Sequence, residues 1–318
     1  MWEIHTKASS LDFVLEPNGV ELWVKRDDLI HPEISGNKWR KLKHHLDAFE
    51  ESGKSEILTF GGAFSNHIAA TAALGDLCNI PTHALIRGEE EMKNNPTLNF
   101  CLEKGMRLEG ISRKQYDTKD DPKFLRTLAL LMPQVFIIPE GGKGPLGLQG
   151  CMEIPSEVDE HFDYWAIAGG TGTTAAGVLA SESVSKLLLY PALKGGQFLK
   201  PAIFNQLLAY FENHKSQSPS LRSLQEKIIL RDSYHFGGYA KINPDLVSFL
   251  NTFQANYALK LDPVYTGKMF FGILEDINQG MFPKGSKIVA LHSGGLQGIA
   301  GMNKRLRAKN LETINYEA

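Results

Sequence analysis

The chain has 318 residues, enough for about two domains, and its 42% hydrophobic residues suffice to bury ordinary cores. Its 34 Lys and Arg residues against 36 Asp and Glu residues give a net charge of -2. This balance excludes the strongly basic surface of a protein that binds nucleic acid or an anionic membrane, so we expect a small-molecule partner.

Short apolar runs alternate with helical patterns along the chain, with Gly or Pro between them. The expected strands are residues 20–24, 57–60, 83–86, 107–110, 135–138, 165–168, 187–190 and 288–291. The expected helices are residues 66–77, 97–104, 123–131, 173–181, 245–257, 268–278 and 296–304, and another helix is expected to begin beside Lys38. This alternation is typical of mostly parallel sheets covered by helices, so the predicted fold class is α/β.

The three cysteines, Cys78, Cys101 and Cys151, form an odd and widely spaced set. This set matches neither a disulfide framework nor a CxxC metal site, so we expect reduced thiols and no metal. No apolar run reaches about 18 residues, and the N-terminal residues are not followed by the apolar segment of a signal peptide. We therefore expect a cytoplasmic protein with no membrane segment.

Four Gly-rich turns follow apolar strands, at residues 61–67, 140–144, 169–174 and 292–295. The third contains Gly170, Thr171, Gly172, Thr173 and Thr174, and it is the best candidate to bind a phosphate. Small residues let backbone N–H groups approach an anion, and the following helix presents its positive end.

Other interpretations of this turn remain. The turn also fits a dinucleotide fingerprint, but the acidic residue expected about 20 positions later is absent. A nucleoside-triphosphate loop is disfavoured because no Lys-Ser/Thr pair follows the glycines. A Gly-Thr turn can also serve only to pack a strand against a helix.

Lys38 stands between Asn37 and the bulky Trp39 at the start of a predicted helix. Partial burial would lower the pKa of its amine and allow the amine to attack a carbonyl group. Taken alone, the same local sequence also fits an ordinary charged residue at a helix start.

The order of several motifs decides between these interpretations. The motifs are Lys25-Arg26-Asp27-Asp28, Ser35-Gly36-Asn37-Lys38, Arg40-Lys41, Ser65-Asn66-His67, Asp262-Pro263-Val264-Tyr265-Thr266-Gly267-Lys268 and His292-Ser293-Gly294-Gly295. Together they span residues 25 to 295, and they resemble the pyridoxal-phosphate-dependent aminocyclopropane-carboxylate deaminase and D-cysteine desulfhydrase family. The resemblance implies a two-domain fold of the tryptophan-synthase-β type (fold type II) and a homodimer. Residues 1–41 and 141–318 would form the larger domain and residues 42–140 the smaller one, with pyridoxal 5'-phosphate in the cleft between them.

The resemblance also implies roles for individual residues. Lys38 would be the Schiff-base lysine, Lys41 and the turn at residues 170–174 would hold the phosphate, and Asn66 would face the ring hydroxyl. Ser65, together with Asn66 and His67, would bind the amino-acid substrate near its carboxylate. Ser65 can at the same time cap its helix, because a hydroxyl both donates and accepts.

Two tyrosines would reach the reacting side chain of the substrate by the same resemblance. They are Tyr265 and Tyr239. For Tyr239, a packed ring with a satisfied hydroxyl is the simpler alternative.

Two further positions bear on the reaction. In the deaminases of the family, the position of Thr266 looks like a Glu that faces the ring nitrogen of the cofactor. A carboxylate keeps that nitrogen protonated and strengthens the electron sink, whereas a hydroxyl does so much less. The position of Ser293 looks like a hydroxyl residue in desulfhydrases and an apolar one in deaminases. Thr266 and Ser293 therefore favour elimination of a good leaving group from a D-amino acid such as D-cysteine.

Substrate identity stays open at this stage. His67 stands where many relatives have Gln, and Trp39 replaces a small or β-branched residue. The alternatives are an aminocyclopropane-carboxylate deaminase, a racemase, dehydratase or other lyase on the same fold, and a non-catalytic ligand-binding relative.

Overall fold

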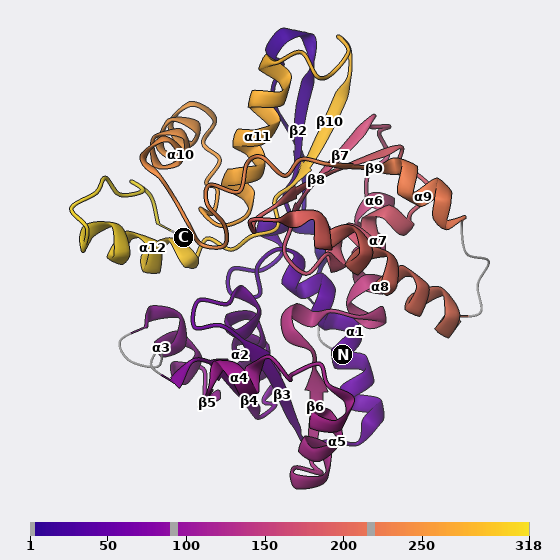
Figure 1. The fold of residues 1–318 in the computed structure, drawn as a ribbon, viewed down its shortest axis with the longest axis vertical. Helices are drawn as coiled ribbons and strands as arrows, with labels where there is room; N and C mark the ends of the chain where they lie inside the picture. Colours follow the sequence, from indigo (N-terminus) through magenta and orange to yellow (C-terminus); the bar gives the residue numbers. More distant parts are fainter. Residues whose placement is uncertain (1–3, 90–94, 215–219, 318) are drawn as a thin grey trace.

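The computed structural model describes residues 4–89, 95–214 and 220–317, and it contains two sheets (Figure 1). The six-stranded sheet has the order β1-β2-β10-β7-β8-β9, and the four-stranded sheet has the order β5-β4-β3-β6. Only the β1–β2 pair is antiparallel among the pairs formed by these strands. Helices cover both sheets, which confirms the predicted α/β class.

The strands of the larger sheet are β1 (Leu11–Leu15), β2 (Glu21–Lys25), β10 (Lys287–Leu291), β7 (Tyr164–Gly169), β8 (Lys186–Pro191) and β9 (Ile228–Leu230). Those of the smaller sheet are β5 (Arg107–Ile111), β4 (Thr82–Arg87), β3 (Glu56–Gly61) and β6 (Val135–Ile138). The eight expected strands all occur, with ends within one residue of those expected. β1 and β9 were not expected from the sequence.

The α-helices are α1 (Asn37–Ser52), α2 (Asn66–Cys78), α3 (Pro96–Glu103), α4 (Arg113–Tyr116), α5 (Pro122–Leu131), α6 (Pro145–Ser156), α7 (Thr173–Ala180), α8 (Leu199–His214), α9 (Leu221–Lys227), α10 (Pro244–Tyr257), α11 (Thr266–Asn278) and α12 (Gly298–Arg307). Short 3-10 turns occur at Thr6–Ala8, Pro17–Gly19, Asp27–Leu29, Glu140–Gly142 and Gly196–Phe198. The expected helices all occur, whereas α4, α6, α8 and α9 were missed. In the part of the chain that the structure describes, no helix is long and apolar enough to cross a membrane.

The larger sheet is buried on both faces, which explains its near-continuous apolar strands. On one face, Leu22 and Ile288 pack with residues of α10 and α11 such as Leu250 and Phe270. On the other face, strand residues pack with α6, α7 and α8 (Figure 1).

The smaller sheet is also covered on both sides. Ile57 packs with α1 and α2, and Phe60 packs toward Tyr116 and α5. The boundary that we predict between residues 41 and 42 falls inside α1, and the division of the chain into domains stays a prediction.

The carboxyl ends of strands from both sheets lead into one region. β3 leads to Ser65, β6 to Glu140, β7 to Gly170 and β10 to Ser293, and all four of these residues line the same cavity. Ligands in open α/β folds bind where strand ends and helix N-termini converge. The two sheets thus define the position of the candidate site.

Candidate functional site

A cavity of about 650 Å³ lies between the two sheets. It brings together most of the side chains and turn residues singled out from the sequence, namely Lys38, Lys41, Ser65, Asn66, His67, Gly170, Thr171, Gly172, Thr174, Tyr239, Tyr265 and Ser293. Thr173 and Thr266 do not line it. The hydroxyl of the fully buried Thr173 donates to Gln206 Oε1 at 2.8 Å, which ties the phosphate-type turn to α8.

Lys38 lies at the cavity wall in the first turn of α1. Its Nζ donates to Asn37 Oδ1 at 2.5 Å, and Asn37 Nδ2 donates to Thr174 Oγ1 at 2.8 Å. Burial and the nearby positive charge of Lys41 lower the pKa of Lys38 to about 7. A substantial fraction of this amine is therefore neutral near pH 7, as nucleophilic or proton-transfer chemistry requires.

Two glycines allow the loop before Lys38 to touch the loop that carries Ser293. Gly36 has φ 66°, and a Cβ placed on it would lie 1.9 Å from the carbonyl oxygen of Ser293. Gly294 has φ 74°, and its Cβ would lie 2.4 Å from Ser35 Oγ. Only glycine fits both the backbone conformation and the close approach. This contact brings Ser293 and Lys38 to one cavity.

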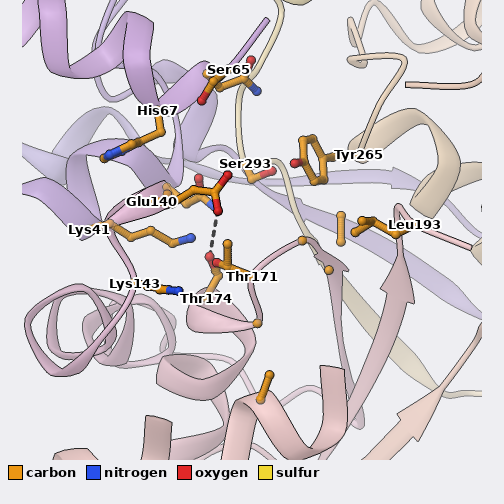
Figure 2. Close-up of a pocket in the computed structure, with 18 of the residues that line it drawn as sticks. Lys41, Ser65, His67, Glu140, Lys143, Thr171, Thr174, Leu193, Tyr265 and Ser293 are labelled. Carbon is orange, nitrogen blue, oxygen red and sulfur yellow. Dashed lines mark hydrogen bonds between the residues drawn. The ribbon is translucent and has the colours of Figure 1, made fainter. Parts of the chain in front are cut away.

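Lys41 supplies a buried cation beside the Gly-Thr turn. Its side chain is 5% exposed, and its Nζ points toward Thr171 and Thr174 (Figure 2). Burial lowers the pKa of Lys41, and among the described residues its ammonium has no hydrogen-bond acceptor. Gly172, with φ 81°, begins α7 and directs the positive end of that helix toward the same space. An anionic group in this position would satisfy both charges.

Ser65, Asn66 and His67 approach the cavity from the start of α2 (Figure 2 shows Ser65 and His67). Ser65 Oγ accepts a hydrogen bond from the backbone N–H of Ile68 at 3.4 Å, so Ser65 caps the helix and lines the cavity at once. Asn66 Oδ1 accepts from Gln297 Nε2 at 2.8 Å, which fixes the orientation of its amide.

The hydrogen bonds around His67 determine its tautomer. Thr59 Oγ1 donates its proton to the carbonyl of Ile138 at 2.8 Å, so it accepts from His67 Nε2, also at 2.8 Å. His67 Nδ1 is then an unprotonated acceptor, and it has no partner among the described residues. Burial, followed by the charges of Lys38 and Lys41, places the pKa of His67 well below its usual value. The ring is neutral near pH 7.

Tyr239 and Tyr265 meet on another side of the cavity. Their rings are 6.1 Å apart in an edge-on arrangement. Burial raises the pKa of both hydroxyls above the usual value for tyrosine. The Tyr265 ring rests against the phosphate-type turn, since a Cβ placed on Gly170 would lie 3.0 Å from it.

The buried carboxylate of Asp262 organises the turn that carries Tyr265. It accepts hydrogen bonds from the backbone N–H groups of Val264, Tyr265 and Thr266 at 2.7 to 2.9 Å. Thr266 Oγ1 also donates to Asp262 Oδ1 at 2.7 Å. The hydroxyl that we expect to face a cofactor ring is thus engaged by Asp262, and that expected role stays a prediction.

The outer part of the cavity contains charged residues that the sequence analysis missed. Glu140 accepts a hydrogen bond from Tyr116 at 2.6 Å and pairs with Lys119 at 3.3 Å. Lys143 pairs with Asp120 at 2.5 Å. The only local signal was the Gly-rich turn at residues 140–144, which precedes α6.

No protein-family model matches the chain. It is 29% identical over 297 residues to the D-cysteine desulfhydrase of Klebsiella pneumoniae, covering 87% of each chain. It is also 29% identical over 309 residues to the bifunctional D-cysteine desulfhydrase/1-aminocyclopropane-1-carboxylate deaminase, mitochondrial, of Arabidopsis thaliana, covering 89% of this chain and 74% of that protein. A solved structure of an ACC deaminase homologue matches with a TM-score of 0.80 at 24% identity, covering 96% of this chain and 95% of the other.

The structural similarity establishes the fold, which is that of the fold type II pyridoxal-phosphate enzymes. The sequence similarity extends over nearly the whole chain, as the order of the motifs indicates. The chain is an enzyme similar to the aminocyclopropane-carboxylate deaminases and D-cysteine desulfhydrases, which confirms the resemblance carried by its motifs.

Proposed function

We propose that this enzyme eliminates the thiol group of D-cysteine, giving pyruvate, ammonia and sulfide. The observation that carries the proposal is that none of the described residues places a free carboxylate in the inner part of the site. Thr266 occupies the position that looks like a Glu in the deaminases of the family. The Thr266 hydroxyl donates a hydrogen bond to Asp262. Among the described residues that line the cavity, the carboxylates are Asp120 and Glu140, and both pair with lysines. A weak electron sink suits a good leaving group such as thiolate.

The residues present fit pyridoxal 5'-phosphate. The Lys41 ammonium, which lacks an acceptor among the described residues, and the turn at residues 170–174 would hold its phosphate. The neutral fraction of Lys38 suits attachment to its aldehyde. When bound, the cofactor supplies an electron sink that stabilises negative charge at the substrate α-carbon.

The remaining steps are assigned to side chains of the chain itself. Ser65, Asn66 and His67 would orient the substrate carboxylate at the start of α2. The amine of Lys38 would take the α-proton, which requires its neutral form. Tyr239 and Tyr265 would lie at the leaving sulfur and supply its proton as the C–S bond breaks. Hydrolysis of the released aminoacrylate then gives pyruvate and ammonia.

Parallel turnover assays test the proposal, using D-cysteine, L-cysteine, D-serine and aminocyclopropane carboxylate with the purified holoenzyme. We expect sulfide and pyruvate from D-cysteine at the highest kcat/KM and little 2-oxobutanoate from aminocyclopropane carboxylate. If aminocyclopropane carboxylate is turned over faster than D-cysteine, the proposed desulfhydrase function is wrong and the deaminase alternative is favoured. Ser293→Ala is expected to lower the ratio of D-cysteine turnover to aminocyclopropane-carboxylate turnover, because it removes the hydroxyl typical of the desulfhydrases.

The visible absorption of the purified protein separates an enzyme from a non-catalytic relative. We expect a yellow band from bound cofactor that is lost in Lys38→Ala. Lys43→Ala is a matched control, because Lys43 lies on the same helix but pairs with Glu153 outside the cavity. A colourless protein that takes up no added pyridoxal phosphate would contradict the cofactor assignment.

We also propose a homodimer and a cytoplasmic location, on the basis of the family resemblance. Light scattering after size-exclusion chromatography measures the mass directly. A single species near the mass of one chain, 35.3 kDa, would refute the dimer.

A further inference from the structure

The loop that carries Tyr239 has an unfavourable backbone conformation. Phe236 and Ala240 both have φ 52°, and the intervening Gly237 and Gly238 have φ 90° and 121°. Positive φ values cost free energy at non-glycine residues and persist only where the surroundings impose them. Some contact outside the loop must therefore hold it in place.

Lys268 makes that contact from the first turn of α11. Its Nζ donates to the carbonyls of Gly238 at 2.7 Å and His235 at 2.9 Å, with a longer contact to that of Ala192 at 3.4 Å. Ala192 directly precedes the cavity-lining residue Leu193, and the other two acceptors lie just before Tyr239. One ammonium thus joins two loops to one helix.

The burial of Lys268 is costly for a purely structural residue. Its side chain is 2% exposed, and it forms no ion pair with a carboxylate in the described residues. Burial lowers its pKa to about 8, and the charge of Asp262 opposes this shift only in part. An ammonium removed from water without a counter-ion destabilises a fold, so an apolar residue would serve better if packing were the only requirement.

The position of Lys268 suggests a role that offsets the destabilisation caused by burying its ammonium. Tyr265 stands three residues earlier, at the N-terminal end of the same helix. A residue that attaches the Tyr239 loop to this helix end therefore fixes Tyr239 relative to Tyr265. The two rings lie 6.1 Å apart in an edge-on arrangement, and both side chains line the cavity.

We propose that Lys268 is a positioning residue that clamps the Tyr239 loop onto the start of α11, so that the two tyrosine side chains meet at the cavity. This inference rests on the proposed function only where it assigns the tyrosines to the leaving group. The attachment of the Tyr239 loop to α11 by Lys268 does not depend on which substrate the enzyme uses.

The first experiment measures the loop without reference to activity. Lys241 is exposed and directly follows the strained segment. Limited proteolysis with trypsin should cut after Lys241 at least about tenfold faster in Lys268→Met than in the parent protein, because the loop opens locally. Lys268→Arg keeps charged donors and should restore most of the protection, and Lys268→Gln should be intermediate. Equal cleavage rates in folded Lys268→Met and parent protein would overturn the clamp.

The second experiment is a double-mutant cycle on D-cysteine turnover. Lys268→Met should lower kcat at least about tenfold with a smaller change in KM, because a displaced proton donor loses part of its contribution of about 10²–10⁴-fold. Adding Tyr239→Phe should cause little further loss, because both changes remove the same group from its place. Lys194→Met is the control in a neighbouring loop and should combine with Tyr239→Phe multiplicatively. Multiplicative losses for Lys268→Met would also overturn the proposal.

The two experiments separate this inference from the proposed function. If the loop opens in Lys268→Met but the parent protein does not turn over D-cysteine, the clamp stands and the substrate assignment fails. If Lys268→Met does not fold, the cleavage rate and the double-mutant cycle are measured with Lys268→Gln and Lys268→Arg in its place.

Discussion

Replacing Gly36 by Ala tests whether the approach of the Lys38 loop to the Ser293 loop organises the site. Gly36 has φ 66° and ψ -145°, which lies outside the left-handed helical region and costs a non-glycine residue about 1–3 kcal/mol. The added Cβ would also lie 1.9 Å from the Ser293 carbonyl oxygen, far inside an ordinary contact, so two backbone segments must separate. Overpacking of this kind costs about 1–3 kcal/mol. The expected loss of unfolding free energy is thus about 2–6 kcal/mol.

Gly53→Ala is the matched control for this substitution. Gly53 also has a positive φ, 65°, but it lies in the milder left-handed helical region, and a Cβ placed on it has nothing within 4 Å. Its loss should be about 1 kcal/mol, which is the cost of the backbone conformation alone. Urea unfolding of the proteins without added cofactor measures both losses, and titration with pyridoxal phosphate then compares cofactor affinity. We expect weaker cofactor binding only in Gly36→Ala. Equal stability losses and equal affinities would refute the argument that this contact shapes the site.

Two further changes test charged groups in the fold. Glu157→Gln should weaken the loss of unfolding free energy at acidic pH. Burial alone would raise the pKa of Glu157, but Arg40 and Lys25 lower this pKa to about 2. Its contribution is therefore complete above the ordinary pKa of 4.5 and is lost as pH falls toward 2, and an unchanged acid limb in urea unfolding would contradict this. Asp262→Ala should cost about 3 kcal/mol or more by leaving buried N–H groups unpaired, whereas the partly exposed Asp12→Ala should cost less than about 1 kcal/mol. Similar losses for the two would be inconsistent with the Asp262 network.

The sequence predicts the strands well where they are buried on both faces, because such strands are continuous apolar runs. The two strands that escaped prediction lie at the edges of the larger sheet. β1 contains Asp12 and the half-exposed Phe13, and β9 has three residues. Neither offers the apolar pattern on which the prediction depends.

Helix α6 was missed for a different reason. It contains Pro145, Gly147, Gly150 and Pro155, which read locally as turn residues. The structure explains Gly150, because a Cβ there would lie 1.8 Å from the carbonyl oxygen of Arg40. The glycine permits close packing of α6 on α1. That requirement comes from another helix and leaves no trace in the local pattern.

The site was predictable as a set of motifs but not as an arrangement. The residues around Lys38 converge because strands distant in sequence end at one cavity. The direction of a side chain is a separate matter. Thr266 and Asp262 stand four residues apart in one motif, yet only the folded structure shows that the Thr266 hydroxyl donates a hydrogen bond to the Asp262 carboxylate. Likewise, the tautomer of His67 follows from Thr59, which no motif includes.

The contact between Tyr265 and Gly170 has a consequence for changing what this enzyme accepts. The glycine belongs to the turn proposed to hold the phosphate, and the ring is proposed to meet the substrate. A Cβ added to the glycine would lie only 3.0 Å from the ring, so the two are in tight contact. A substitution that shifts the ring will press on the turn. Variants selected at position 265 for new substrates should therefore retain their cofactor less firmly, and recovering that affinity will require a second change near residue 170.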